Sequence, residues 1–115
     1  MAKKTYTTLI NAAHASAPSG SATFIADDYS RISLAMTTVG GSCVCKYKIT
    51  IYPTIDTPDS AAVTYADTTG STAAAVTLFD NFADAQGVPY IFYKVKVDWE
   101  SLASGNLVAA VAAQI

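Results

Sequence analysis

The side chains that could perform catalysis in this 115-residue chain are few: one histidine, His14, and two cysteines, Cys43 and Cys45. Nucleophilic catalysis needs a nucleophile, a base and an orienting group in contact, and no nucleophile-elbow pattern surrounds any serine. Both cysteines fall on one face of a predicted strand, where a buried thiol distant from positive charge stays protonated. We therefore predict no catalytic residues and interpret the protein as non-enzymatic.

A metal site would need more ligands than the chain is expected to bring together. Zinc takes about four ligands, and His14 is distant in the sequence from the cysteines. A disulfide between Cys43 and Cys45 would be strained, so both thiols are expected to be buried and free, with an intermolecular disulfide as the alternative. Calcium needs about six to eight oxygens, which Asp27–Asp28 and Asp80–Asp84 could supply in part only if their loops meet. The sequence predicts no metal and no cofactor.

The elements that must position these side chains are strands, because apolar and polar residues alternate along the chain. Residues 31–38, 43–52 and 90–100 alternate most clearly, which is typical of half-buried antiparallel strands. For residues 90–100 we expect one face to hold Ile91, Tyr93, Val95, Val97 and Trp99, and the other to hold Phe92, Lys94, Lys96 and Asp98.

Weaker strand patterns occupy residues 5–13, 22–25, 61–65 and 73–79. The tail, residues 106–115, is rich in alanine, so a helix is the rival interpretation there. We favour a strand, because the turn at residues 104–106 would return the tail beside the Trp99 strand as a hairpin. Residues 80–87 are predicted to form a loop, with Phe79 or Phe82 against the core.

Eight strands separated by glycine- and proline-containing turns predict an all-β fold. The expected architecture is a single-domain antiparallel β-sandwich spanning residues 1–115, with the jelly roll as one arrangement of its strands. Residues 1–8 are expected to form an N-terminal arm that becomes ordered against a partner.

The composition excludes several classes of protein. Hydrophobic residues make up 51% of the chain and charged residues 14%, with a net charge of −2, which is too apolar for intrinsic disorder. The chain has no basic excess for binding a nucleic-acid backbone, and no apolar run near the roughly 20 residues of a membrane helix. It also shows no export signal, so we expect it to fold in a cytoplasm.

Two groups of surface residues could take part in recognition. Lys46 and Lys48, with Lys94 and Lys96, would cluster on one sheet face if their strands are neighbours. A solubilising face is the favoured interpretation; protein contact and nucleic-acid binding are the alternatives, the latter disfavoured by the acidic chain. Tyrosines at predicted strand ends could line a sugar or protein site, or seal the ends of the sandwich. These are Tyr29, Tyr52, Tyr65 and Tyr90.

Several segments together resemble small virion proteins of tailed bacteriophages. The resemblance begins with Thr-Leu-Ile-Asn-Ala-Ala at residues 8–13, followed by Pro-Ser-Gly-Ser at residues 18–21, and continues with Asp-Tyr-Ser-Arg-Ile-Ser-Leu at residues 28–34. A central strand (45–52), a penultimate strand (89–97), a turn (101–105) and a final apolar strand (107–111) complete it.

This resemblance implies a β-sandwich without catalytic residues that decorates a capsid or forms part of a head or tail. The expected partners are the major capsid protein or other virion proteins, with self-association, a trimer favoured, and a location in the virion after synthesis in the host cytoplasm. No membrane partner is expected. The alternative is a carbohydrate-binding module of a tail tip or adhesin, resting on the loop tyrosines and aspartates. The candidate interface residues are Lys3, Lys4, Tyr6, Tyr29, Tyr52, Tyr65, Tyr90 and Phe92.

Overall fold

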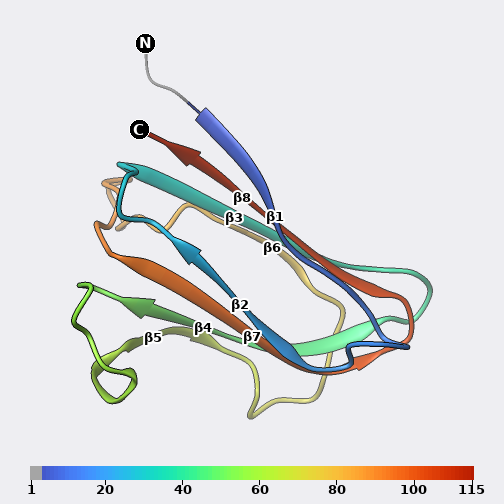
Figure 1. Ribbon diagram of the computed structural model, residues 1–115. Coiled ribbons are helices and arrows are strands. Elements are labelled where there is room, and N and C mark those ends of the chain that lie inside the picture. Colours follow the sequence, from blue (N-terminus) through green and yellow to red (C-terminus); the bar gives the residue numbers. More distant parts are fainter. Residues whose placement is uncertain (1–3) are drawn as a thin grey trace.

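Eight strands form two four-stranded antiparallel sheets that face each other (Figure 1). The structure is a computed structural model that describes residues 4–115. The all-β sandwich predicted from the alternation is therefore confirmed, together with its eight strands. The strands are β1 (Lys4–Ala13), β2 (Gly20–Ile25), β3 (Arg31–Val39), β4 (Val44–Tyr52), β5 (Val63–Asp67), β6 (Thr77–Asp80), β7 (Lys94–Ala103) and β8 (Asn106–Gln114).

Helical structure in the described residues is limited to one short 3-10 segment, η1 (Asp59–Ala61), between β4 and β5. No helix in this part of the chain is long and apolar enough to cross a membrane. The tail that could have been a helix is strand β8. Its inward positions hold branched residues and alanines that pack into the core, so tertiary packing overrides the helix propensity of alanine.

The strand order is β1-β8-β3-β6 in one sheet and β2-β7-β4-β5 in the other. The predicted hairpin between the Trp99 strand and the tail is wrong, because β8 pairs with β1 and β3 and not with β7. Ser104 and Gly105, both at positive φ, carry the chain from one sheet to the other. Gly105 lies so close to the carbonyl oxygen of Val39 in β3 that a side chain would collide with it.

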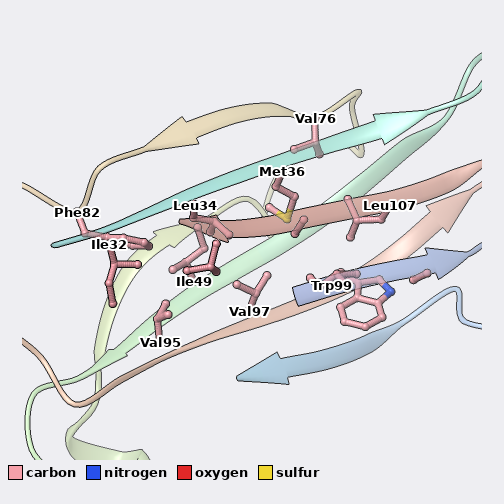
Figure 2. Close-up of a cluster of buried hydrophobic side chains, with 14 of the residues drawn as sticks. Ile32, Leu34, Met36, Ile49, Val76, Phe82, Val95, Val97, Trp99 and Leu107 are labelled. Carbon is pink, nitrogen blue, oxygen red and sulfur yellow. The ribbon is translucent and has the colours of Figure 1, made fainter. Parts of the chain in front are cut away.

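One apolar core fills the space between the sheets. Figure 2 shows side chains of β3 and β8 pointing toward those of β4 and β7. Leu34, Ile49, Val95, Val97 and Leu107 have no measurable exposure, and the structure places no polar or charged side chain in the core of residues 4–115. Hydrophobic burial is the main force that holds the two sheets together.

The predicted alternation fails just before β7. Tyr93 donates its N–H to the carbonyl of Tyr52 (2.9 Å) and accepts from the N–H of Ala26 (2.7 Å), and the regular strand begins only at Lys94. In the irregular segment Phe92 turns inward and is 6% exposed, whereas Ile91 is 90% exposed. Both had been predicted on the opposite faces. Phe92 is drawn inward because its ring packs edge-on against Phe82, with the centroids 5.6 Å apart.

The predicted arm differs from what the structure describes. Residues 4–8 continue β1 and pair with β8, from Lys4 opposite Gln114 to Thr8 opposite Ala110. The first three residues of the expected arm lie outside the described residues. In the loop after β6, Phe82 is 1% exposed and belongs to the core, as one of the two alternatives predicted, whereas Phe79 is 71% exposed.

The sandwich has two ends of different construction. The apolar end carries the loops 26–30, 53–62 and 81–93, which lie at the left of Figure 1 beside the two termini. The other end, which we call the opposite end, carries the connections 14–19, 40–43, 68–76 and 104–105. Because antiparallel strands run alternately between these ends, each end gathers side chains from both sheets.

Candidate binding surfaces

The residues with catalytic chemistry are used to hold the opposite end together. The Nδ1 of His14 lies 2.6 Å from the carbonyl oxygen of Leu102, so this nitrogen carries the proton that is donated. Cys43 and Cys45 are buried and free. The Sγ of Cys45 lies 3.4 Å from the carbonyl of Glu100, and burial raises the pKa of this thiol. The described hydrogen bonds of His14 go to backbone groups rather than to a thiol or carboxylate.

The loop carboxylates mostly accept hydrogen bonds from nearby groups. Asp80 accepts from the hydroxyl of Tyr65 (2.7 Å) and from the N–H of Phe82 (2.8 Å). Asp84 accepts from two backbone N–H groups of its own loop, those of Gln86 and Val88. Within residues 4–115, no three acidic, cysteine or histidine side chains are grouped so that they could hold a metal ion.

The four lysines lie on neighbouring strands, as β4 and β7 pair, but carboxylates are interleaved with them. Lys48 is opposite Asp98 on one side and Asp67 on the other, and Lys46 is opposite Glu100. Lys96 lies 3.7 Å from Asp98. A phosphate backbone is attracted by uncompensated positive charge, and this face offers a mixture of both signs.

The structure separates the predicted interface residues into exposed and buried groups. Lys4 and Tyr6 on β1 are exposed, Tyr6 by 76%, and Tyr90 is 47% exposed. Tyr29 and Tyr65 are half-buried. Lys3 lies outside the described residues.

Tyr52 and Phe92 are buried, at 3% and 6% exposure, which corrects their prediction as surface residues. The Tyr52 ring is covered by the Lys94 ammonium, 4.5 Å from its centroid, and its hydroxyl donates to Asp59 over 2.8 Å. That hydrogen bond raises the pKa of Tyr52. Tyr52 therefore fastens the loop after β4 instead of contacting a partner.

Exposed apolar residues gather at the apolar end of the sandwich. We call four of them the apolar patch: Ile55, Val63, Tyr90 and Ile91, exposed by 71%, 52%, 47% and 90%. Isolated exposed apolar side chains are common on protein surfaces, whereas a group of them is typical of an interface.

Two hollows flank Ile91 at this end. The first, of about 320 Å³, is lined by apolar and aromatic residues. The second, of about 330 Å³, adds polar groups. Pro53, Ile91 and Phe92 line both hollows, so Ile91 stands as a ridge between them. The other residues of the first hollow are Ile51, Val63, Tyr65 and Tyr90, and those of the second are Asp27, Tyr29, Thr54, Ile55 and Tyr93.

Aromatic rings that pack against one another form the base of the first hollow. The centroid of Tyr65 lies 5.0 Å from that of Phe82 and 6.4 Å from that of Tyr90. Burial, together with the hydrogen bond to Asp80, raises the pKa of Tyr65 to about 12. Because Tyr65 and Phe82 pack against the core, the base of the hollow is part of the folded structure.

Sequence reasoning missed Ile91, the most exposed of these residues. Alternation places Ile91 on the same face as Val95 and Val97, which indicates a core position. The available signal is the turn at residues 87–89, because an alternating pattern that directly follows a glycine and a proline need not belong to the ladder.

Comparisons with known proteins place the fold beside a phage protein. No protein-family model and no curated protein matches the chain. Among solved structures, the crystal structure of the SPBc2 prophage-derived protein YomS is similar, with a TM-score of 0.52 and 11% sequence identity. The similarity covers 100% of this chain and 96% of that one. At this identity the likeness establishes a shared fold with a protein of prophage origin.

Proposed function

We propose that this protein is a non-enzymatic virion structural protein, a capsid decoration or cement protein that packs against the major capsid protein or other virion proteins. The observation that carries the proposal is the apolar patch, above all the nine-tenths exposed Ile91 between two hollows. The similarity to a prophage-derived protein and the resemblance to small virion proteins support the same role.

The energetics favour a contact made by packing. Complete burial of one isoleucine side chain stabilises a complex by about 1.5–3 kcal/mol, which corresponds to roughly 10- to 150-fold in affinity. The hollow beside Ile91 can receive an apolar side chain of the partner, so that both surfaces lose water. Such a contact requires no reaction, metal or cofactor from this chain.

The connectivity of the strands is consistent with this role. Successive strands pass from one sheet to the other, except from β4 to β5. We propose that this is a jelly-roll connectivity, a fold used by viral capsid domains and by lectins. Fold alone does not specify function, so the apolar patch and not the connectivity decides between these uses.

Incorporation into particles tests the proposal. Virions of the phage that encodes this chain would be produced from a genome lacking its gene, with the chain supplied in trans. The wild-type chain is expected in purified virions at a fixed ratio to the major capsid protein, measured by quantitative mass spectrometry. Ile91→Asp, which places a charge in the patch, is expected to reduce that ratio by at least about tenfold.

Two controls make the experiment specific. Val39→Asp changes an apolar residue that is 48% exposed at the opposite end and should be incorporated normally. Ile91→Val keeps an apolar side chain and should retain most of the incorporation. Absence of the wild-type chain from virions, or normal incorporation of Ile91→Asp, would refute the proposal.

A carbohydrate-binding module of a tail tip or adhesin is the second candidate function. The second hollow favours it, because Asp27 and Thr54 offer hydrogen bonds to hydroxyl groups beside the rings of Tyr29 and Tyr93. A glycan array, probed with and without calcium, should then show binding that Tyr29→Ala removes. An array without any binding would eliminate this candidate and leave the virion role in place.

A further inference from the structure

Strand β1 forms one edge of the β1-β8-β3-β6 sheet and is the longest edge strand of the molecule. Nine of its ten residues pair with β8 on one side. In the described part of the chain, the remaining backbone hydrogen bonds of β1 are at Ala13, where the turn begins. Backbone groups that point away from β8 therefore have no described protein partner, and such an edge can accept a further strand.

The other three edge strands are shorter. β6 has four residues, β5 has five and β2 has six. β5 also ends at Asp67, whose pKa is lowered by hydrogen bonds from Thr69, so a charge stands at that edge. Short strands and fixed charges are features that prevent edges from pairing. Among its described residues, β1 has one charge, Lys4, and contains no proline.

The part of β1 that is open to pairing is Lys4–Thr8. The register with β8 shifts between Thr8 and Ile10, which bends the strand, and from Ile10 onward its inward side chains enter the core. Before the shift, the segment consists of a lysine, three threonines and Tyr6, and all of them except the half-buried Thr5 are exposed. Threonine and tyrosine are residues that favour strands.

We propose that the Lys4–Thr8 segment pairs with the same segment of a second copy of this chain, antiparallel and centred on Tyr6. A two-fold axis lets one strand serve as its own partner, because identical edges then present matching donors and acceptors. With this centre, Tyr6 lies opposite Tyr6 of the second copy, and Lys4 lies opposite Thr8 of the second copy. Like charges are thus kept apart and two aromatic rings become a cross-strand pair.

The pairing would join the two β1-β8-β3-β6 sheets into one continuous sheet. Tyr6 is level with Ala112 on β8 and Ser33 on β3, and Thr8 is level with Ala110 and Ala35. These small residues leave a shallow hollow beside Tyr6 on the outer face, where Lys4, Arg31 and Gln114 also lie. The inference goes beyond the proposed function, because two edges can pair without any virion protein. It specifies a dimer in place of the trimer that the family resemblance implied.

Charge complementation at Tyr6 tests the pairing on the purified full-length chain. Analytical ultracentrifugation should show a reversible, concentration-dependent dimer for the wild-type chain. In Tyr6→Lys and in Tyr6→Glu, like charges face each other across the two-fold axis, and each dissociation constant should rise by about tenfold or more. An equimolar mixture of the two variants should restore the dimer, because opposite charges then face each other.

A matched control lies at the other edge of the same sheet. Phe79 on β6 is an aromatic residue of similar exposure, 71% against 76% for Tyr6. Phe79→Lys and Phe79→Glu should dimerise like the wild-type chain. A monomeric wild-type chain at high concentration, a trimer, or Tyr6 variants that dimerise normally would each overturn the inference. Its failure is distinct from that of the proposed function, which is decided by incorporation of Ile91 variants into virions.

Discussion

The two ends of the sandwich use their side chains in opposite ways. At the opposite end, the indole N–H of Trp99 donates to the carbonyl of Ala17 (3.1 Å), His14 donates to Leu102, and Gly20 lies against the Trp99 ring. At the apolar end, Ile91 and its neighbours remain exposed over a floor of packed aromatic rings. One end is closed by interactions within the chain, and the other retains surface for contact with another molecule.

This difference separates the residues needed for folding from those available for binding. Hydrogen bonds and close backbone approaches at the opposite end leave little tolerance for substitution, because each group is fixed by a neighbour. The patch residues touch the rest of the chain on only part of their surface. We therefore expect substitutions of the groups that make these contacts to change stability, and substitutions in the patch to change association.

Among substitutions at the opposite end, Gly105→Ala should have the largest effect on stability. Gly105 has φ +58°, and an added Cβ would meet the carbonyl of Val39. The left-handed conformation costs a non-glycine residue about 1–2 kcal/mol, and the collision adds about 1–3 kcal/mol. Urea denaturation should therefore show a loss of about 2–5 kcal/mol in the free energy of unfolding.

Gly41→Ala is the matched control for this substitution. Gly41 also has positive φ, +40°, but a Cβ there would meet no atom within 4 Å. Its cost should be limited to the conformational part, about 1–2 kcal/mol. If both variants lost the same stability, the close contact that joins β3 to the turn before β8 would contribute nothing.

The sequence predicted where the strands lie, but not the orientation of every side chain next to them. Alternation assigns faces wherever a ladder is continuous, so Val95, Val97 and Trp99 on β7 were correctly placed on one face, and that face is buried. It fails at Ile91 because the ladder begins only at Lys94, and the packing of Phe92 on Phe82 decides the orientation before that point. A long-range contact of this kind leaves no trace in a local pattern.

The hydrophobic pattern also could not predict which strands lie side by side. The apolar tail that forms β8 is equally compatible with pairing to β7, as predicted from the turn, or with its actual place between β1 and β3. Backbone pairing is nearly independent of residue type, so a hydrophobic face specifies which side is buried but not which strand lies beside it. Among the candidate interface residues, Tyr6 and Tyr90 are exposed as expected. Tyr52 is buried because Lys94 and Asp59 engage its ring and hydroxyl.

Tyr65→Phe tests the packed aromatic rings at the apolar end. Its effect on stability should lie between those of Gly105→Ala and Ile91→Ser. Removing the hydroxyl deletes its hydrogen bond to Asp80, which still accepts from the N–H of Phe82, so the loss should be about 1 kcal/mol at neutral pH. The pKa of Tyr65 is raised from 10 to about 12 in the folded state. The unfolded chain therefore releases this proton at lower pH than the folded protein.

The sign of the pH dependence follows from that raised pKa. The stabilisation from protonated Tyr65 should be complete below pH 10 and should disappear as the pH rises from 10 through about 12. Denaturation of both proteins across this range should show the wild-type chain losing its advantage over Tyr65→Phe. A difference that stays constant with pH would mean that the hydroxyl is not protected in the folded state.

Ile91→Ser should have the smallest effect on stability, and it addresses the comparison of the two ends most directly. Because Ile91 is 90% exposed, little apolar surface is lost from the core, and the free energy of unfolding should change by less than about 0.5 kcal/mol. Phe92→Ser, one residue further along, removes a ring that is 6% exposed and should cost about 3–5 kcal/mol. Urea denaturation of the two variants side by side measures both values. If the order were reversed, Ile91 would belong to the core as its alternation suggests, and the apolar end would have no exposed ridge to offer a partner.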